Sequence, residues 1–438
     1  MSLVQKHRLK YYLLFICLTL AFGAAQGNNE FVFMFDGSQF DESELEEINS
    51  LLMSDDSFLT VSSEINSSDE AEQVFGQLSL FDIFGSIPTD VSKLVKFFSG
   101  ECKNQVFGIF QSQSSEVTSQ EIAENMGNLV SGDVLFSDKR YAIGTQGNGT
   151  AEAVSIDDFL SYISVDVSDD TRGSGVIIAV IDSGVTQIDG SPPIMAESLD
   201  LIDVDIEIED KDSSGHGTII TRIANSVAPS ADMLSITACV EGICFVDRVI
   251  FGMCHAATLA SLNERKLVIN LSMSDELNQQ NGVLADALTK RLATGITIVT
   301  SVGNFGNPCV SESDFDSCFP AKFNILGEAD GLITTASLAR INGNFVPADV
   351  RVNGDYIDVA ALGENLVVDG FIFSGSSFAA PWVSGVAALI LATDPNLTNT
   401  KAEECIKRFA VSIGDSQFVG LGRIDVSNLI SENGTNCQ

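Results

Sequence analysis

The sequence predicts an α/β protein with a mostly parallel central sheet, helices on both faces of that sheet, and a smaller α+β domain ahead of it. Three observations lead to this prediction. Val176–Ile181 is a continuous apolar run, typical of a strand buried on both faces. A long apolar helix pattern begins at Ser377. Residues 30–111 alternate between strand and helix patterns.

Residues 1–25 have the pattern of a secretory signal peptide. A basic start precedes the apolar run Tyr11–Ala21, and the small residues Gly23 and Ala25 follow at positions suited to cleavage. A short membrane anchor is the weaker alternative, because a helix that spans a bilayer needs ~20 apolar residues. We expect no later segment to span a membrane. The predicted location is extracellular or the lumen of the secretory pathway, without stable membrane insertion after the signal is removed.

Residues 29–111, here called the predicted prodomain, show the order β-α-β-β-α-β. The strand patterns are Phe31–Phe35, Phe58–Val61, Gln77–Phe84 and Val106–Phe110, and the helix patterns are Asp41–Met53 and Pro88–Phe98. This order is the ferredoxin-like arrangement. A free-standing small binding domain is the alternative interpretation.

Residues 112–164 are polar and rich in Ser, Gly and Asp, apart from helical patterns at 122–129 and 156–163. We interpret them as a linker and the start of the mature chain, followed by a main domain over 165–430. The dibasic pair Lys139-Arg140 is a candidate processing site, although such pairs are more often plain surface charges.

Acidic residues dominate the charge: 60 Asp and Glu stand against 23 Lys and Arg, which gives a net charge of −37. A surface of this sign repels nucleic acid and anionic membranes, so neither is an expected partner. Otherwise the charge favours solubility, and it does not by itself indicate basic substrates.

Nine cysteines include Cys17 in the predicted signal peptide and leave eight, an even number that suits an oxidising compartment. Spacing does not decide connectivity, but it favours the pairs Cys239–Cys244, Cys309–Cys318 and Cys405–Cys437. Cys102 and Cys254 remain. A bridge between them would tether the predicted prodomain, so we expect Cys254 to be a free buried thiol on a helix.

Glycosylation sequons occur in polar stretches at four positions, Asn66, Asn148, Asn396 and Asn433. A fifth sequon, at Asn270, lies in a core-strand pattern and is not expected to be modified. The chain is therefore a candidate glycoprotein.

Three residues stand in settings that could hold them still. Asp182 ends the apolar strand run, glycines flank His216, and Ser377 opens a helix, where N-terminal amides favour developing negative charge. A nucleophilic serine needs a general base within hydrogen-bond reach, and the base needs a group that fixes its tautomer. These residues would fill those roles. His255 lies in a packed-helix pattern with no second metal ligand nearby, so a structural role is expected for it.

The segments Val180–Gly184, Gly215–Thr218 and Gly375–Pro381, and their order along the chain, resemble those of the subtilisin-like serine proteases. Further segments match in the same order, and together they cover about residues 165–425: Val227–Pro229 with the strand Ala231–Ala238, Val268–Met273, Gly303–Gly306 after Ile296–Val299, Phe319–Lys322 and Val359–Gly363. The resemblance implies a subtilisin-like three-layer catalytic domain and an inhibitory prodomain ahead of it.

The resemblance also implies site roles. Asp182, His216 and Ser377 would form the catalytic triad. Asn304 would donate to the oxyanion together with the backbone N–H of Ser377. By the same likeness, the substrate-binding residues are Ser272, Met273, Ser274 and Gly303. Ser274 departs from the family, which usually has a glycine there to pair with extended substrate.

The chain between His216 and Pro229 is too short for the calcium-binding loop that the family commonly carries there. We therefore expect no required cofactor and no metal at the site, although surface carboxylates could form weak calcium sites. The expected partners are protein or peptide substrates and the chain's own prosegment, acting as an intramolecular inhibitor. A Cys309–Cys318 bridge would brace a mainly apolar specificity pocket and favour cleavage after large hydrophobic residues.

The leading interpretation is a secreted serine endopeptidase made as a zymogen. A catalytically silent binding or inhibitory protein of the same fold is the second, although only Ser274 favours it. A lipase or esterase is the third. It would require Gly375–Ala379 to act as a nucleophile elbow, but the final glycine is missing and the histidine precedes the serine.

Overall fold

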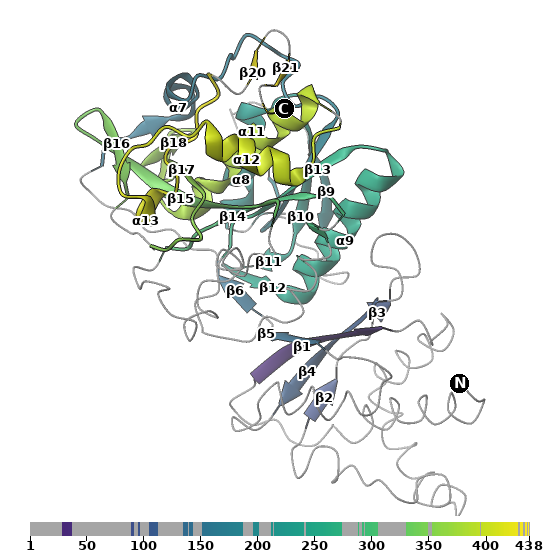
Figure 1. The fold of residues 1–438 in the computed structure, drawn as a ribbon. Helices are drawn as coiled ribbons and strands as arrows, with labels where there is room; N and C mark the ends of the chain where they lie inside the picture. The colour runs from purple at the N-terminus through teal and green to yellow at the C-terminus, as the bar shows by residue number, and fades with distance from the viewer. Residues whose placement is uncertain are drawn as a thin grey trace, which may run out of the picture. The chain divides into compact units, whose positions relative to one another are not determined.

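A computed structural model describes six short strands before residue 143 and most of the chain from residue 151 onward. The described ranges are 29–36, 89–91, 95–96, 105–112, 135–138, 140–142 and 151–438, the last with gaps at 187–195, 201–211, 213, 241, 274–287, 289–290, 293, 305–329, 349–352, 395, 428–429, 432–433, 436 and 438. The chain divides into two compact units, one with the first five strands and one with the rest (Figure 1). The predicted signal peptide lies outside the described residues.

The first unit contains a sheet in the order β2-β4-β1-β5, with β3 also paired to β4. Its strands are β1 (Asn29–Asp36), β2 (Thr89–Val91), β3 (Val95–Lys96), β4 (Gln105–Ser112) and β5 (Leu135–Asp138). The strands predicted at Phe31–Phe35 and Val106–Phe110 are confirmed. The helix predicted over Pro88–Phe98 is wrong, because β2 and β3 pair there with β4. The other strand and helix patterns of the predicted prodomain lie outside the described residues.

The second unit is built on an eight-stranded sheet in the order β16-β15-β14-β13-β8-β10-β9, with β17 also paired to β15. Every pairing in it is parallel except that of β15 with β16. The strands are β8 (Val176–Asp182), β9 (Ala196–Asp200), β10 (Asp232–Thr237), β13 (Lys266–Leu271), β14 (Thr297–Ser301), β15 (Leu332–Ile341), β16 (Asn344–Pro347) and β17 (Val359–Leu362). The predicted mostly parallel α/β sheet is confirmed.

Helices cover both faces of this sheet (Figure 1). The helices are α7 (Ile156–Tyr162), α8 (His216–Val227), α9 (Val246–Leu262), α11 (Ala380–Thr393), α12 (Asn399–Arg408) and α13 (Ser416–Val419). The alternation of β8 explains the layers. Ile178 packs in one core with α8 and α11, whereas Ile181 turns to the other face, beneath Gly252 of α9. A side chain at Gly252 would collide with Ile236 of β10.

Helix α11 is the centre of the larger core. Its residues are almost all buried, and a side chain at Gly385 would meet Val227 of α8 at 2.4 Å, so glycine allows the two helices to touch. Among the described residues, only Ser376–Thr393 is long and apolar enough to cross a membrane. That stretch is 89% buried inside the protein, as expected for a central core helix.

Short sheets and disulfides complete the second unit. The hairpin of β11 (Cys239–Val240) and β12 (Ile243–Phe245) carries a disulfide between Cys239 and Cys244, and β12 pairs antiparallel with β6 (Arg140–Ala142). A second disulfide joins Cys405 of α12 to Cys437. Both bridges confirm the predicted pairs, while the pair Cys309–Cys318 lies outside the described residues. The second hairpin is formed by β18 (Leu366–Val368) and β19 (Phe371–Phe373), beside β7 (Val154–Ser155).

The prediction of a free thiol at Cys254 is wrong. Cys254 lies buried on α9, as expected, but it is disulfide-bonded. Its sulfur also accepts a hydrogen bond from Arg291 at 3.6 Å. The prediction failed because sequence spacing carries no information on which cysteines meet in the fold. Asn270 is buried in β13, as predicted, and Asn396 is exposed.

A buried ionic cluster joins α12 to the edge of the main sheet, and we call it the α12 cluster. The ammonium of Lys407 lies 2.8 Å from Asp358 Oδ1 and 3.0 Å from Glu403 Oε1. Each carboxylate also accepts a hydrogen bond from a backbone amide: Thr334 N–H donates to Asp358, and Gly331 N–H donates to Glu403. Burial nevertheless raises the pKa of Asp358 to about 6, against the lowering effect of Lys407.

Candidate active site

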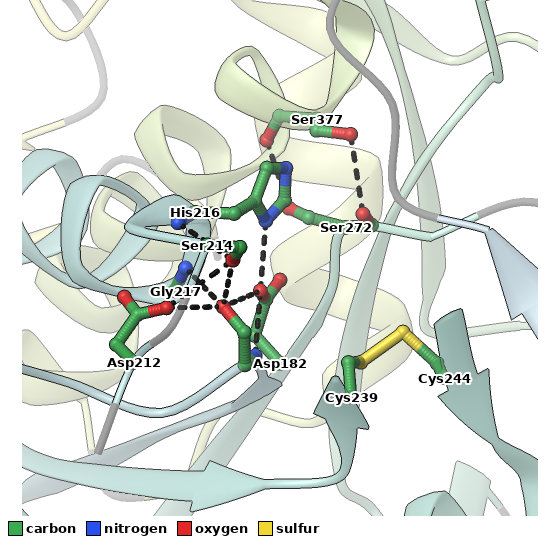
Figure 2. Close-up of a disulfide and its surroundings, with 10 residues drawn as sticks. Asp182, Asp212, Ser214, His216, Gly217, Cys239, Cys244, Ser272 and Ser377 are labelled. Carbon is green, nitrogen blue, oxygen red and sulfur yellow. Dashed lines mark hydrogen bonds and ion pairs between the residues drawn. A yellow bond between two sulfur atoms is a disulfide. The ribbon is translucent and has the colours of Figure 1, made fainter. Parts of the chain in front are cut away.

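The carboxyl end of β8 and the start of α8 bring Asp182 and His216 together. Asp182 is the last residue of β8, and His216 is the first of α8. His216 Nδ1 and Asp182 Oδ1 are 2.7 Å apart, and both side chains are buried (Figure 2). Backbone N–H of Ser183 also donates to Asp182 Oδ1, at 2.8 Å. Because the carboxylate accepts from Nδ1, it holds the tautomer with Nε2 available as an acceptor.

Glycine is required on the helix side of this contact. Gly215 precedes the helix with φ at 73°, in the left-handed region. A side chain on Gly217 would come within 2.3 Å of the carbonyl oxygen of Gly184. The first turn of α8 therefore packs directly on the backbone that follows Asp182. The flanking glycines that singled out His216 in the sequence serve this close approach.

Ser377 lies in a tight turn, Ser376–Phe378, that leads into α11. The sequence places it at the opening of the helix, and the structure places it one turn earlier, with Pro381 in the first turn of α11. The ring of Phe378, the next residue, packs on the His216 ring with centroids 5.3 Å apart. Nε2 of His216 is buried and makes no hydrogen bond to any residue that the structure describes. The turn that carries the serine thus lies against the imidazole.

Ser272 at the end of β13 contacts Ser377 in two ways. The Ser377 hydroxyl donates to the carbonyl oxygen of Ser272 at 3.1 Å, and Ser272 Oγ donates to the carbonyl oxygen of Ser377 at 2.8 Å (Figure 2). Asn270 donates to Ser272 Oγ, and Ser384 of α11 donates to Asn270. This buried chain of hydrogen bonds ties the serine turn to β13 and α11. Ser272 itself is fully buried.

Asn304 follows β14 and faces the same turn. Its Oδ1 accepts from the backbone N–H of Ser376 at 2.6 Å and from the Ser376 hydroxyl at 2.9 Å. A backbone N–H can only donate, so these contacts orient the amide with its oxygen toward Ser376. Ser376 Oγ also lies 2.9 Å from the carbonyl oxygen of Gly303. Both members of the predicted Gly-Asn pair therefore contact the residue next to Ser377.

Of the remaining predicted site residues, the structure describes two and does not describe the third. Met273 and Gly303 are buried next to Ser272 and Asn304, and Ser274 lies outside the described residues. Among the described residues, no group of three or more His, Cys, Asp or Glu side chains is arranged to hold a metal ion.

Sequence reasoning missed two polar residues of this region, Asp212 and Ser183. The buried Asp212 carboxylate accepts hydrogen bonds from Ser183 and from Gly215 in the turn before His216. The available signal was an acidic residue four positions before His216 and a hydroxyl directly after Asp182. Neither pattern is specific, and only the fold shows that the two segments meet.

Comparisons with known proteins identify the family of this chain. The model of the subtilase family, Peptidase S8, matches residues 173–422. Subtilisin E of Bacillus subtilis is 29% identical over 270 residues, which are 58% of this chain and 65% of that protein. Subtilisin of Bacillus pumilus is 28% identical over 270 residues, 58% of this chain and 90% of its own length.

The fold is also that of a solved structure. Fervidolysin from Fervidobacterium pennivorans, described as a keratinolytic enzyme related to subtilisin, superposes with a TM-score of 0.57 at 17% identity, over 93% of this chain and 62% of that one. The family model covers more than half of the chain and includes Asp182, His216, Asn304 and Ser377. The chain belongs to the subtilase family.

Proposed function

We propose that this chain is a serine endopeptidase that uses Ser377 as nucleophile, His216 as general base and acid, and Asp182 as the group that orients the base. The observation that carries the proposal is the buried Asp182–His216 contact beneath the serine turn. A carboxylate that holds Nδ1–H leaves Nε2 as the acceptor for a serine proton.

The reaction needs one small rearrangement. The Ser377 hydroxyl donates to the Ser272 carbonyl, so rotation about its Cα–Cβ bond would bring Oγ–H to Nε2 of His216. The oxygen would then attack the peptide carbonyl carbon, and the proton would pass to Nε2. On collapse of the tetrahedral intermediate, the amine leaves with that proton. Water then attacks the acyl-enzyme while His216 takes its proton. The carboxylic acid product leaves as His216 returns that proton to Ser377.

The negative charge of the tetrahedral intermediate needs donors aimed at it. We assign this role to the side-chain amide N–H of Asn304 and to the backbone N–H of Ser377. The contacts of Asn304 Oδ1 with Ser376 support the assignment, because they fix which end of the amide can donate. Met273, Ser274 and Gly303 are proposed to pair with the substrate backbone. Ser272 remains a proposed substrate contact, although its observed contacts are with Ser377.

Substrate preference is part of the proposal: broad cleavage after large hydrophobic residues. Profiling on a peptide library tests it, and strict cleavage after Arg or Lys would contradict it. No metal is proposed for catalysis, and any calcium would occupy weak surface sites. A melting curve with and without EGTA tests this point, because a metal bound only to the folded state adds stability that chelation removes.

The last part of the proposed function is that the protein is made as a secreted zymogen. The pairing of β6 with β12 supports it, because a strand from the polar segment before the main domain lies along the hairpin that continues from β10. Until the chain is processed, this pairing holds the segment that follows the predicted prodomain on the main domain. N-terminal sequencing of the secreted protein locates processing. Equal activity of precursor and processed protein, with no inhibition by added prosegment, would contradict the zymogen.

Cleavage of casein by the purified protein, with Ser377→Ala as control, tests the central activity. Hydrolysis that disappears in the variant supports the endopeptidase. A folded wild-type protein that cleaves neither casein nor ester substrates would instead favour the silent binding protein, and cleavage of long-chain esters alone would favour the lipase.

A further inference from the structure

A second buried carboxylate stands behind the proposed triad. Asp212 is only 4% exposed and lies in the turn before α8. The mechanism above, on which this inference rests, gives it no role. Burying a carboxylate costs free energy of folding unless hydrogen-bond donors surround it. The donors around Asp212 therefore show which segments this side chain holds in place.

Asp212 gathers donors from both segments that carry the Asp–His pair. On the helix side, Gly215 N–H donates to Oδ1 at 2.9 Å, and Thr218 donates to Oδ2 through its N–H at 2.7 Å and its hydroxyl at 2.5 Å. On the strand side, the Ser183 hydroxyl lies 2.7 Å from Oδ1. Ser214 Oγ is also within reach, at 3.2 Å. One side chain therefore joins the loop after β8 to the first turn of α8.

The hydrogen bonds of Ser183 show which of the two carboxylates its hydroxyl group donates to. Its oxygen accepts from Gly217 N–H at 2.9 Å, and Ser214 Oγ donates to it at 2.8 Å. Its single proton can go to Asp212, at 2.7 Å, or to Asp182 Oδ1, at 3.2 Å. The shorter contact favours Asp212. The two carboxylates are thus separated by one hydroxyl group.

We propose that Asp212 is a positioning residue for the proposed catalytic pair. It holds Asp182 and His216 in register through Ser183 and the first turn of α8. Its negative charge also adds to that of Asp182 when His216 becomes an imidazolium during the reaction. The sequence of α8 contains one Asp, Glu, Lys or Arg residue, Arg222, and it forms an ion pair with Asp369 at 2.8 Å.

Two variants and a matched control test the proposal in the full-length processed protein. Asp212→Asn removes the charge, and Ser183→Ala removes the bridge but keeps the charge. Asp358→Asn is the control, because Asp358 is an equally buried carboxyl far along the chain in the α12 cluster. Each protein is measured for kcat and KM across pH, for its melting curve, and for the rate of labelling by a fluorophosphonate.

In both Asp212→Asn and Ser183→Ala, kcat should fall by about 10- to 100-fold, the effect of losing hydrogen bonds to a charged group, with KM within about twofold of wild type. Asp212→Asn should also move the acid limb of the kcat/KM profile down by about 0.5 to 1 pH unit, because removing a negative charge makes His216 easier to deprotonate. Ser183→Ala should leave the acid limb in place, and Asp358→Asn should leave both kcat and the limb unchanged.

The proposal is overturned if both variants fold and keep wild-type kcat and acid limb, or if any loss of kcat merely follows the unfolded fraction. Should Asp212→Asn fail to fold, the kcat of Ser183→Ala decides. A wild-type protein inert toward casein and the fluorophosphonate would overturn the proposed function and this inference with it. An active wild type with unaffected variants would overturn only the inference.

Discussion

Asp212 and Asp358 are two equally buried carboxyl groups, each 4% exposed, that lie in very different surroundings. Asp212 accepts neutral N–H and O–H donors from the loop after β8, from the turn before α8 and from the first turn of α8. Asp358 in the α12 cluster faces the ammonium of Lys407 and a second carboxylate, Glu403. Short neutral donors on backbone and hydroxyl groups fix position, whereas a long lysine side chain mainly balances charge.

The comparison separates two kinds of polar burial. The residues around Asp182, Asp212 and His216 hold the proposed catalytic groups, and the α12 cluster holds a helix on the sheet. Changes in the first region should therefore lose activity with little loss of stability. Changes in the second should lose stability with little loss of activity.

The largest effect is expected for His216→Ala. Removing the general base of a serine-protease triad lowers kcat by about 10⁶-fold. The melting temperature should change little, because Asp182 keeps the hydrogen bond from the backbone N–H of Ser183 when the imidazole is removed. His255→Ala is the control, since His255 lies half-buried on α9, and it should keep wild-type kcat. Comparable losses in the two variants would contradict the assignment.

Asn304→Ala should have the next largest effect on activity. Loss of one oxyanion donor typically lowers kcat by about 10²–10³-fold, and KM should stay near the wild-type value because the donor acts on the transition state. Steady-state kinetics on a peptide substrate measure both constants. A rise in KM with unchanged kcat would mean that Asn304 binds substrate rather than the oxyanion.

In the α12 cluster, Lys407→Met should lower stability at pH 7 by about 1–3 kcal/mol. It leaves Asp358 and Glu403 buried together without a cation, and the 32% exposure of the Lys407 side chain keeps the loss below that of a fully buried pair. Lys401→Met on the same helix is the control. Its partner Glu404 is exposed, so the expected loss is below about 1 kcal/mol. Urea unfolding measures both, and equal losses would contradict the account.

A smaller, pH-dependent effect is expected for Asp358→Asn. Burial raises the pKa of Asp358 from 3.8 to about 6 in the folded protein, so the fold favours its protonated form. The carboxyl therefore contributes stability that is fully present below about pH 4 and is lost as pH rises past about 6. The stability of wild type relative to Asp358→Asn should fall by up to about 3 kcal/mol over that window. Lys407 and Glu403 are present in both proteins, so the comparison isolates Asp358. Urea unfolding at several pH values measures the stability difference, and an advantage of wild type that grows with pH would contradict the prediction.

Much of the main domain could be predicted from its sequence. The strand ending at Asp182 is a continuous apolar run and the helix after Ser377 is a long apolar pattern, and the structure confirms both elements. The segment 88–98 was mistaken for a helix because short strands that pair with a distant β4 leave little local pattern. Cys254 was misjudged because disulfide partners are chosen by the fold.

The candidate site also contains residues that local sequence patterns predict and one that they do not. Asp182 and His216 could be singled out because each stands beside a recognisable local pattern, and the structure places them in contact. Asp212 could not, because its role depends on Ser183, which is 29 residues away in sequence and close only after β8 and α8 have packed. A spacing rule cannot find a contact that tertiary packing creates.

The most direct test of the central claim is where a fluorophosphonate reacts. The processed wild-type protein is treated with the reagent, digested and mapped by mass spectrometry, with Ser377→Ala and His216→Ala in parallel. We expect one phosphonylated residue, Ser377, no label in Ser377→Ala, and labelling slowed by orders of magnitude in His216→Ala. A folded wild-type protein that stays unlabelled, or that is labelled at a serine other than Ser377, would contradict it.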